Sequence, residues 1–497
     1  MQGNREPFRS ILRVVGLFTA VTVIQLALYQ PVPALSSIVS LSSSWFDEGD
    51  ENGAEYGNAV AAAGDVNGDG YDDIIVGAPK HSNIVDRGGS VFVYYGSAGG
   101  LPNQFDWTLS SDRKGAAFGA AVGAGDFNGD GYDDIIIGAP EYNATASGQG
   151  RVYVVYGSPT GLAAAPAWTF EGTQKEEFLG YAVASAGYVN DDPYADIIIG
   201  SWRHQVDGSP VGAALLFYGQ AGGLTQTAPD WTANGSQTGS AFGAAVDSAG
   251  DVNNDGYDDI IVGAPNYDHE QIDEGAAFLF LGRPSGLSGT GDHDWMVEGN
   301  QDDVHFGASV SGAGQVNGDA YADVIIGAPH YTDTVADEGA VFVFYGSGSA
   351  LPLGETADWT AVSRQTGSWF GVSVSGAGDV NKDGFDDVIV GANLYNDNPD
   401  DGQGSVEGAI FVYFGMMGGF QVVGATAVGD KAETELGFSV DGAGDINGDG
   451  YADIIAGAPI YKHDEKTVLG RAYVYLGGEK VFVLNRVYLP LITNSGS

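Results

Sequence analysis

One stretch decides the fold of this chain: DVNGDGYDDIIVGAP, residues 65–79, which follows the aromatic–Gly pair Tyr56-Gly57 and a run of small residues. Related copies of its acidic part begin at residues 65, 126, 188, 251, 315, 379 and 445. Successive starts therefore lie 61 to 66 residues apart. A regular period of this kind indicates one repeated supersecondary unit, and seven such units cover most of the 497 residues.

Each unit contains four strand-like runs, which in the second unit are 118–125, 134–138, 151–157 and the run around Trp168. The first run is rich in Ala and Gly, as expected for an innermost strand where backbones crowd together. The second is continuously apolar and β-branched, which is typical of a strand buried on both faces. Seven units of four strands, without convincing helices, predict an all-β fold: a seven-bladed β-propeller with four-stranded antiparallel blades.

The position of a recurring tryptophan indicates how the ring closes. Trp marks the fourth strand and lies eleven residues before the Phe-Gly position of the first six units, at Trp45, Trp107, Trp168, Trp231, Trp295 and Trp359. Trp45 has no preceding unit, so we predict that residues 38–48 pair with the strand at 471–477 and complete the last blade. The alternative is that residues 480–489 form this edge. The propeller domain then spans residues 38–479.

The two ends of the chain lie outside the repeats. Arg5, Arg9 and Arg13 precede an apolar run at 14–29 and small residues ending at Ala34, so residues 1–34 are interpreted as a signal peptide. The alternative is an uncleaved N-terminal anchor, which would be the one attachment to a membrane. We therefore expect a secreted or cell-surface protein. The β-prone tail, 480–497, is either a short edge strand or a sorting or docking tail.

Composition excludes several classes of function. The formal net charge of −46 argues against a nucleic-acid partner, because phosphate binding requires a basic surface. The chain contains no cysteine, which excludes disulfide bonds, cysteine catalysis and thiolate metal sites. Its stability must come from the core and from bound ions.

The nine-residue acidic loop predicts a metal site. Positions 1, 3, 5 and 9 provide side-chain oxygens and position 7 a backbone carbonyl, an all-oxygen set that suits Ca²⁺. Glycine at position 6 permits the positive φ with which the chain wraps an ion. The alternative is a simple turn sequence, but five intact copies, each with the distal Asp, favour the metal. The intact copies provide Asp65, Asn67, Asp69, Tyr71 and Asp73; Asp126, Asn128, Asp130, Tyr132 and Asp134; Asp251, Asn253, Asp255, Tyr257 and Asp259; Asp379, Asn381, Asp383, Phe385 and Asp387; Asp445, Asn447, Asp449, Tyr451 and Asp453.

Two copies of the loop are degraded. The third begins with Tyr188 and has Pro193 at position 6, so we expect weak or absent metal there. The fifth begins with Gln315 and has Ala320 at position 6, so we expect reduced affinity. Their remaining candidate ligands are Asn190, Asp192 and Asp196 in the third, and Asn317, Asp319, Tyr321 and Asp323 in the fifth. About five Ca²⁺ ions are expected, or six or seven if these loops fill, with a structural role.

Position 8 of the loop varies between copies. It is Asp in units one, two, four and six and Ala in the other three, including the intact seventh. We therefore interpret it as a solvated neighbour and not as a ligand.

The combination of Phe-Gly, the acidic loop D-x-N-x-D-G-x-x-D and Gly-Ala-Pro resembles the FG-GAP repeat of integrin α-subunit β-propellers, over residues 38 to about 479. The resemblance implies calcium loops between the first two strands of the blades, on the lower face, and ligands or partner subunits on the opposite face. All seven loops retain some acidic pattern, which is similar to free-standing microbial FG-GAP proteins.

The loops after each Gly-Ala-Pro are long and polar, and each carries an aromatic residue or His two positions after the proline position. These candidate ligand contacts are His81, Tyr142, His204, Tyr267, Tyr331, Tyr395 and Tyr461. Such amphipathic side chains suit sugar or protein surfaces. The alternative, which we favour, is that each packs against a neighbouring blade as a spacer. The longest loop, 393–408, is the best candidate for a specific contact.

The sequence shows no motif for catalysis. The seven His have no paired metal-ligand spacing, and no nucleophile elbow or phosphate-binding loop occurs. We therefore expect an adhesion or recognition module, without enzymatic activity, that binds an extracellular protein or glycan. One alternative is a secreted hydrolase or lyase with an active site on the propeller axis. The other is a purely structural scaffold for surface display.

Overall fold

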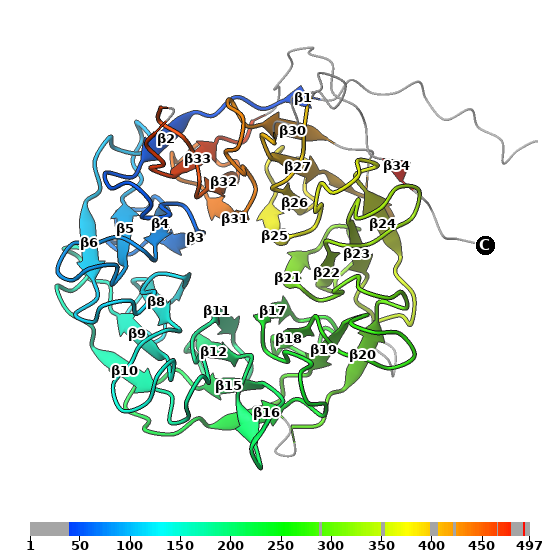
Figure 1. The fold of residues 1–497 in the computed structure, drawn as a ribbon, viewed down its shortest axis with the longest axis horizontal. Helices are drawn as coiled ribbons and strands as arrows, with labels where there is room; N and C mark the ends of the chain where they lie inside the picture. Colours follow the sequence, from blue (N-terminus) through cyan, green and yellow to red (C-terminus); the bar gives the residue numbers. More distant parts are fainter. Residues whose placement is uncertain are drawn as a thin grey trace, which may run out of the picture. The chain divides into compact units, whose positions relative to one another are not determined.

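The computed structural model describes residues 39–287, 291–348, 353–397, 406–420, 424–464, 466–478 and 491–492, all within the compact unit 38–497. In this unit seven antiparallel four-stranded sheets surround a central axis, which makes it an all-β seven-bladed propeller, as predicted (Figure 1). No helix occurs among the described residues.

The strands follow the same order in every blade, from the axis outwards. The innermost strands are β3 (Ala59–Gly64), β7 (Ala121–Gly125), β11 (Ala182–Gly187), β17 (Ala245–Gly250), β21 (Ser309–Gly314), β25 (Ser373–Gly378) and β31 (Ser439–Gly444). The second strands are β4 (Asp73–Ala78), β8 (Asp134–Ala139), β12 (Asp196–Ser201), β18 (Asp259–Ala264), β22 (Asp323–Ala328), β26 (Asp387–Ala392) and β32 (Asp453–Ala458). The third strands are β5 (Ser90–Tyr94), β9 (Arg151–Val155), β15 (Ala213–Phe217), β19 (Ala276–Phe280), β23 (Ala340–Phe344), β27 (Ala409–Tyr413) and β33 (Arg471–Tyr475). The outer strands are β6 (Trp107–Ser110), β10 (Trp168–Glu171), β16 (Trp231–Asn234), β20 (Trp295–Glu298), β24 (Trp359–Val362), β30 (Ala425–Val428) and β2 (Trp45–Glu48). Two small hairpins lie in loops: β13 (Gln205–Val206) with β14 (Ser209–Pro210), and β28 (Gly415–Met416) with β29 (Gly419–Phe420).

The signature glycines occupy places where neighbouring blades touch. A Cβ on Gly77, the glycine of Gly-Ala-Pro in the first blade, would collide with the backbone oxygen of Gly119 in the Phe-Gly pair of the second. The pair Gly138 and Gly180 repeats this contact between the second and third blades. Only glycine permits such an approach of two backbones. The two motifs recur together because each blade supplies one half of the contact.

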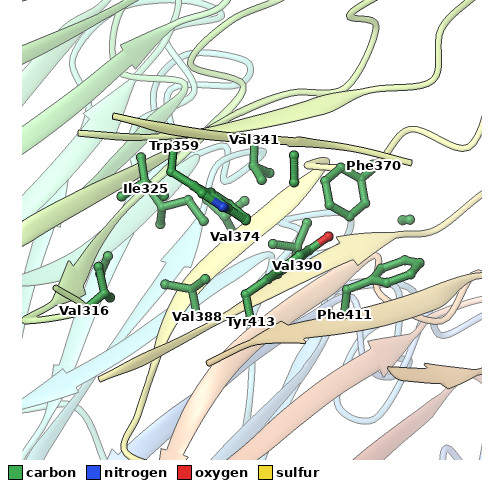
Figure 2. Packing of buried hydrophobic residues seen from close by; sticks show 14 of the residues in the cluster. Val316, Ile325, Val341, Trp359, Phe370, Val374, Val388, Val390, Phe411 and Tyr413 are labelled. Carbon is green, nitrogen blue, oxygen red and sulfur yellow. The ribbon is translucent and has the colours of Figure 1, made fainter. Parts of the chain in front are cut away.

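The hydrophobic core lies between adjacent blades. Figure 2 shows the cluster between the fifth and sixth blades, where Trp359 meets Tyr413 edge-on with ring centroids 4.9 Å apart. Equivalent tryptophan contacts join Trp45 to Tyr94, Trp168 to Phe217, Trp231 to Phe280 and Trp295 to Phe344. These five tryptophans therefore fasten their outer strands to the third strand of the following blade, whereas the outer strand of the sixth blade, β30, contains no tryptophan.

The ring is closed by strands from the N-terminal side. β2 pairs antiparallel with β33, with Trp45 opposite Val474 and Glu48 opposite Arg471. The first part of the predicted strand 38–48 takes a different course, because β1 (Val39–Ser40) pairs in parallel with β30 in the sixth blade. The four residues of β2 already cover the edge of β33 from Arg471 to Val474, which leaves the upstream residues to the neighbouring sheet.

The C-terminal segment makes a different pairing from the alternative closure. β34 (Leu491–Ile492) pairs antiparallel with the outer strand β24 of the fifth blade. Residues 480–489, the alternative edge of the last blade, and residues 1–34 lie outside the described residues.

Candidate functional site

The acidic loops connect the first and second strands of each blade, so all seven lie on one face of the ring. In the first loop the carboxylate of Asp65 accepts N–H groups of Gly68, Asp69 and Gly70 at 2.6, 3.0 and 2.8 Å. Gly70, at position 6, has a φ of 89°. The bonds from positions 5 and 6 to the first Asp recur at Asp126, Asp251, Asp379 and Asp445. The five intact sequences thus fold into the same tight wrap.

The chemistry of the donor set fits a hard divalent cation. No carboxylate at positions 1, 5 or 9 of these loops pairs with Lys, Arg or His in the described residues. In the fourth loop Asn253 Oδ1, at position 3, is buried without a hydrogen-bond partner. The three carboxylates of a loop are not gathered within 4.8 Å of one another, however. Binding an ion would therefore have to draw these oxygens together.

The distal Asp has a second role that the sequence did not reveal. Asp73 is buried, and its two oxygens accept the N–H groups of Val66 at 3.1 Å and Gly96 at 2.8 Å. The same two bonds are made by Asp134, Asp196, Asp259, Asp323, Asp387 and Asp453. Burial raises the pKa of Asp73 to about 8. This residue ties two loops of its blade together even where the metal loop is degraded.

Position 8 is a link between blades, which corrects its interpretation as a solvated neighbour. Asp133 Oδ2 accepts the N–H of Asp65, the first residue of the preceding loop, at 3.0 Å. Asp72, Asp258 and Asp386 make the same bond to Asp445, Tyr188 and Gln315. Burial also raises the pKa of Asp133. Where position 8 is Ala, this side-chain bond to the preceding loop cannot form.

The two degraded loops differ from the intact loops at position 6, where the sequence predicted a difference. Neither Pro193 nor Ala320 has the positive φ of the glycines at position 6. Tyr188, at position 1 of the third loop, is 48% exposed and offers no carboxylate. Asp192 and Asp319 still accept the N–H two residues further on, so part of each turn survives.

The seven candidate ligand contacts do not form an exposed ring. His81, Tyr142, Tyr395 and Tyr461 are buried, while His204, Tyr267 and Tyr331 are half-buried. Five of these rings pack against an aromatic residue of their own third strand: His81 on Phe92, Tyr142 on Tyr153, Tyr267 on Phe278, Tyr331 on Phe342 and Tyr395 on Phe411. Their positions suit spacers in the core better than a binding surface. In the longest loop Asn393 is buried, and residues 398–405 lie outside the described part of the chain.

A partly exposed aromatic cluster lies on the third blade instead, on the face opposite the acidic loops. Trp202 replaces the proline of Gly-Ala-Pro and stacks on Phe178 with ring centroids 5.7 Å apart. Tyr181, 48% exposed, lies 5.8 Å from the Trp202 ring, and the Arg203 guanidinium lies 5.4 Å from it. We call these four residues the aromatic platform. The change to Gly-Ser-Trp in the third unit was the sequence signal for it.

Next to the platform opens a cavity of about 980 Å³ along the propeller axis, lined by the first strands and by Tyr181. Its lining includes Asp247 and Asp441 on β17 and β31. Burial raises the pKa of Asp247 to about 7 and that of Asp441 to about 6. None of the described residues that line the cavity is a histidine.

The described residues contain no helix that is long and apolar enough to cross a membrane.

The sequence profile described as FG-GAP repeat matches residues 56–94, 118–155, 242–280, 306–344, 370–406 and 436–475. The third blade, which carries the aromatic platform and the most degraded acidic loop, is not among these segments.

Several curated proteins are similar to this chain. Over 396 residues it is 29% identical to the phosphatidylinositol-glycan-specific phospholipase D of Rattus norvegicus, which covers 72% of this chain and 45% of that protein. It is 30% identical over 218 residues to integrin alpha-5 of Xenopus laevis, covering 42% of this chain and 20% of the integrin. It is 32% identical over 209 residues to integrin alpha-3 of Cricetulus griseus, covering 41% and 18%. The chain thus spans less than half the length of these relatives.

Proposed function

Since the chain belongs to the FG-GAP repeat family, we propose that it is an exported, calcium-stabilised propeller that recognises an extracellular protein or glycan. The observation that carries this proposal is the aromatic platform. Stacked aromatic rings with a guanidinium beside them offer an apolar face and hydrogen-bond donors, which suits sugar rings and protein side chains alike.

The place of the platform supports a binding role over a structural one. Tyr181 is 48% exposed, although large aromatic side chains gain most from burial. The third blade also differs from the other six because both its acidic loop and its Gly-Ala-Pro motif are changed. Such changes are consistent with a surface that binds a ligand and is not needed to build the repeat. The acidic loops on the other face would then hold Ca²⁺ as a structural ion, away from the ligand.

An enzymatic function is the second candidate, because one similar protein is named a phospholipase D and a cavity lies on the axis. The name describes a protein of which this chain matches 45%. The cavity offers four carboxyl groups, those of Glu55, Glu141, Asp247 and Asp441, and none of its described lining residues is a histidine. This favours recognition, and a structural scaffold is the remaining alternative.

A binding screen against glycans and extracellular proteins, with and without Ca²⁺, tests the proposal. We expect Trp202→Ala to weaken binding at least about tenfold, as removal of a central aromatic contact does. Trp202→Pro, which restores the residue of the other blades, should act alike while keeping the fold. The matched control is Tyr188→Ala, because Tyr188 is equally exposed on the other face of the same blade. Equal binding by all variants would refute the platform, and product release from a bound glycan would favour the enzyme.

A further inference from the structure

A second kind of metal site is suggested by three side chains of the fourth blade, far along the strands from its acidic loop. His269, Glu274 and Glu298 each bring one ligand atom within 4.8 Å of the others. His269 and Glu274 belong to the loop between β18 and β19, and Glu298 ends β20. Loops after the second and fourth strands lie on the face opposite the acidic loops, so this cluster shares no residue with a predicted Ca²⁺ loop.

Glu274 is the unusual member of the cluster. Its side chain is completely buried, and Oε1 accepts the N–H groups of His269 at 2.7 Å and Glu270 at 3.1 Å. Its other oxygen, Oε2, is buried and has no hydrogen-bond partner. A buried carboxylate oxygen without a donor or a cation is costly, which points to a missing group.

The fifth and sixth blades also have a buried glutamate at this position, Glu338 and Glu407, whereas the second blade has an amide. Gln149 stands where Glu274 does, and its Oε1 likewise accepts loop N–H groups. Its amide Nε2 donates to Glu171 at 3.3 Å and to the Gly172 carbonyl at 3.0 Å. In the fourth blade the equivalents of these two acceptors are Glu298 and Gly299. Replacing the amide by a carboxylate removes the donor and leaves oxygens facing oxygens.

The fourth blade also lacks a cationic side chain at the position opposite Glu298. Glu171 pairs across the strands with Arg151, and Glu48 of the seventh blade pairs with Arg471. The partner of Glu298 in the same register is Ala276. The seventh blade even has the same His–Glu contact, His463 Nδ1 to Glu48 Oε2 at 2.7 Å, but with the arginine present and with Leu469 in place of the buried acid.

From this comparison we infer that His269, Glu274 and Glu298 bind a divalent transition-metal ion of the Zn²⁺ class. His269 Nδ1 lies 3.1 Å from Glu298 Oε2, so an imidazole nitrogen and two carboxylates face one small volume. One nitrogen and two oxygens suit Zn²⁺, whereas Ca²⁺ takes oxygen ligands alone. His269 is 58% exposed, so the ion can enter from solvent.

The site is tested by titrating Zn²⁺ into the full chain in saturating Ca²⁺, which fills the loops of the other face. Wild-type protein should bind one Zn²⁺ that Glu274→Gln and His269→Ala bind at least about tenfold more weakly. Glu274→Gln copies the second blade and should fold normally. His463→Ala is the matched control, since it breaks the same His–Glu contact beside an arginine, and it should leave the affinity unchanged. Equal affinity in all four proteins would overturn the inference.

Thermal unfolding in a chelator gives an independent readout. Glu274→Gln should melt above the wild type, because its amide satisfies the buried acceptors. Added Zn²⁺ should raise the melting temperature of the wild type and leave that of Glu274→Gln unchanged. If the variant melts higher but Zn²⁺ does not stabilise the wild type, Glu274 is held by a proton and the inference fails. Substituting Co²⁺ should give a visible absorption band that His269→Ala lacks.

Discussion

The distal aspartate has two roles, hydrogen bonding and predicted metal binding, and Asp196 allows the first to be tested alone. Its loop lacks the carboxylate at position 1. The oxygens of Asp196 accept the N–H groups of Val189 at 3.1 Å and Gly219 at 2.9 Å. Asp196→Ala leaves both buried donors unpaired, so we expect the free energy of unfolding to fall by about 2–4 kcal/mol. Urea unfolding should show the same loss with Ca²⁺ and with chelator. Asp191→Ala, at an exposed position of the same loop, is the control. A loss that disappears in chelator would mean that Asp196 acts through a metal.

Asp247 should give the axial cavity a measurable dependence on pH. Burial raises its pKa to about 7 from an ordinary value of 3.8, with Asp441 adding charge repulsion. The folded protein therefore binds a proton that the unfolded chain releases between about pH 4 and 7, so this group's contribution to stability is lost as pH rises through that window. In the wild type this group should lower the free energy of unfolding by about 1–2 kcal/mol between pH 5 and 8. We expect Asp247→Asn to abolish that decrease. The measurement is urea unfolding of both proteins in Ca²⁺. Parallel pH profiles would contradict the expectation.

At the scale of elements, the last blade depends on β2. Trp45 Nε1 donates to the Pro102 carbonyl at 2.8 Å, and Glu48 pairs with Arg471. A chain starting at residue 50 loses these contacts and exposes the edge of β33. We expect a loss on the order of 5 kcal/mol, from about four backbone hydrogen bonds and the Trp packing. Calorimetry should show a lower melting temperature than for a chain starting at residue 38, which keeps β1 and β2. An unchanged transition would mean that β2 does not hold the ring closed.

The whole molecule should respond to the removal of Ca²⁺ as one cooperative unit, because every blade packs on two neighbours. An ion that binds only the folded state stabilises it by about 2.7 kcal/mol at a hundredfold excess over its Kd, and five intact loops would add such terms. We expect excess chelator to lower the melting temperature substantially and Ca²⁺ to restore it. Asp251→Ala should reduce the number of bound ions by one in calorimetric titration. A transition that is identical in Ca²⁺ and chelator would refute calcium binding.

The sequence by itself determined the number of blades, the order of their strands and the acidic loops. These features are local: the strand patterns and the turn chemistry are complete within one unit, and repetition made them unmistakable. The sequence also placed Trp45 in the last blade, because its pattern lacked a preceding unit. The sequence did not predict that Val39 pairs with β30 and not with β33, because this choice depends on how much of each strand's edge is still unpaired.

Only the tertiary structure decided what individual polar side chains do. Asp133 meets an amide 68 residues away in the preceding blade, which no spacing within the unit reveals. Tyr142 was a candidate ligand contact by its chemistry, yet it is buried in the core. The cluster of Glu274 and Glu298 joins the ends of a loop and an outer strand. Contacts of this kind follow from the register of neighbouring strands and the packing of neighbouring blades, and both are set when the ring closes.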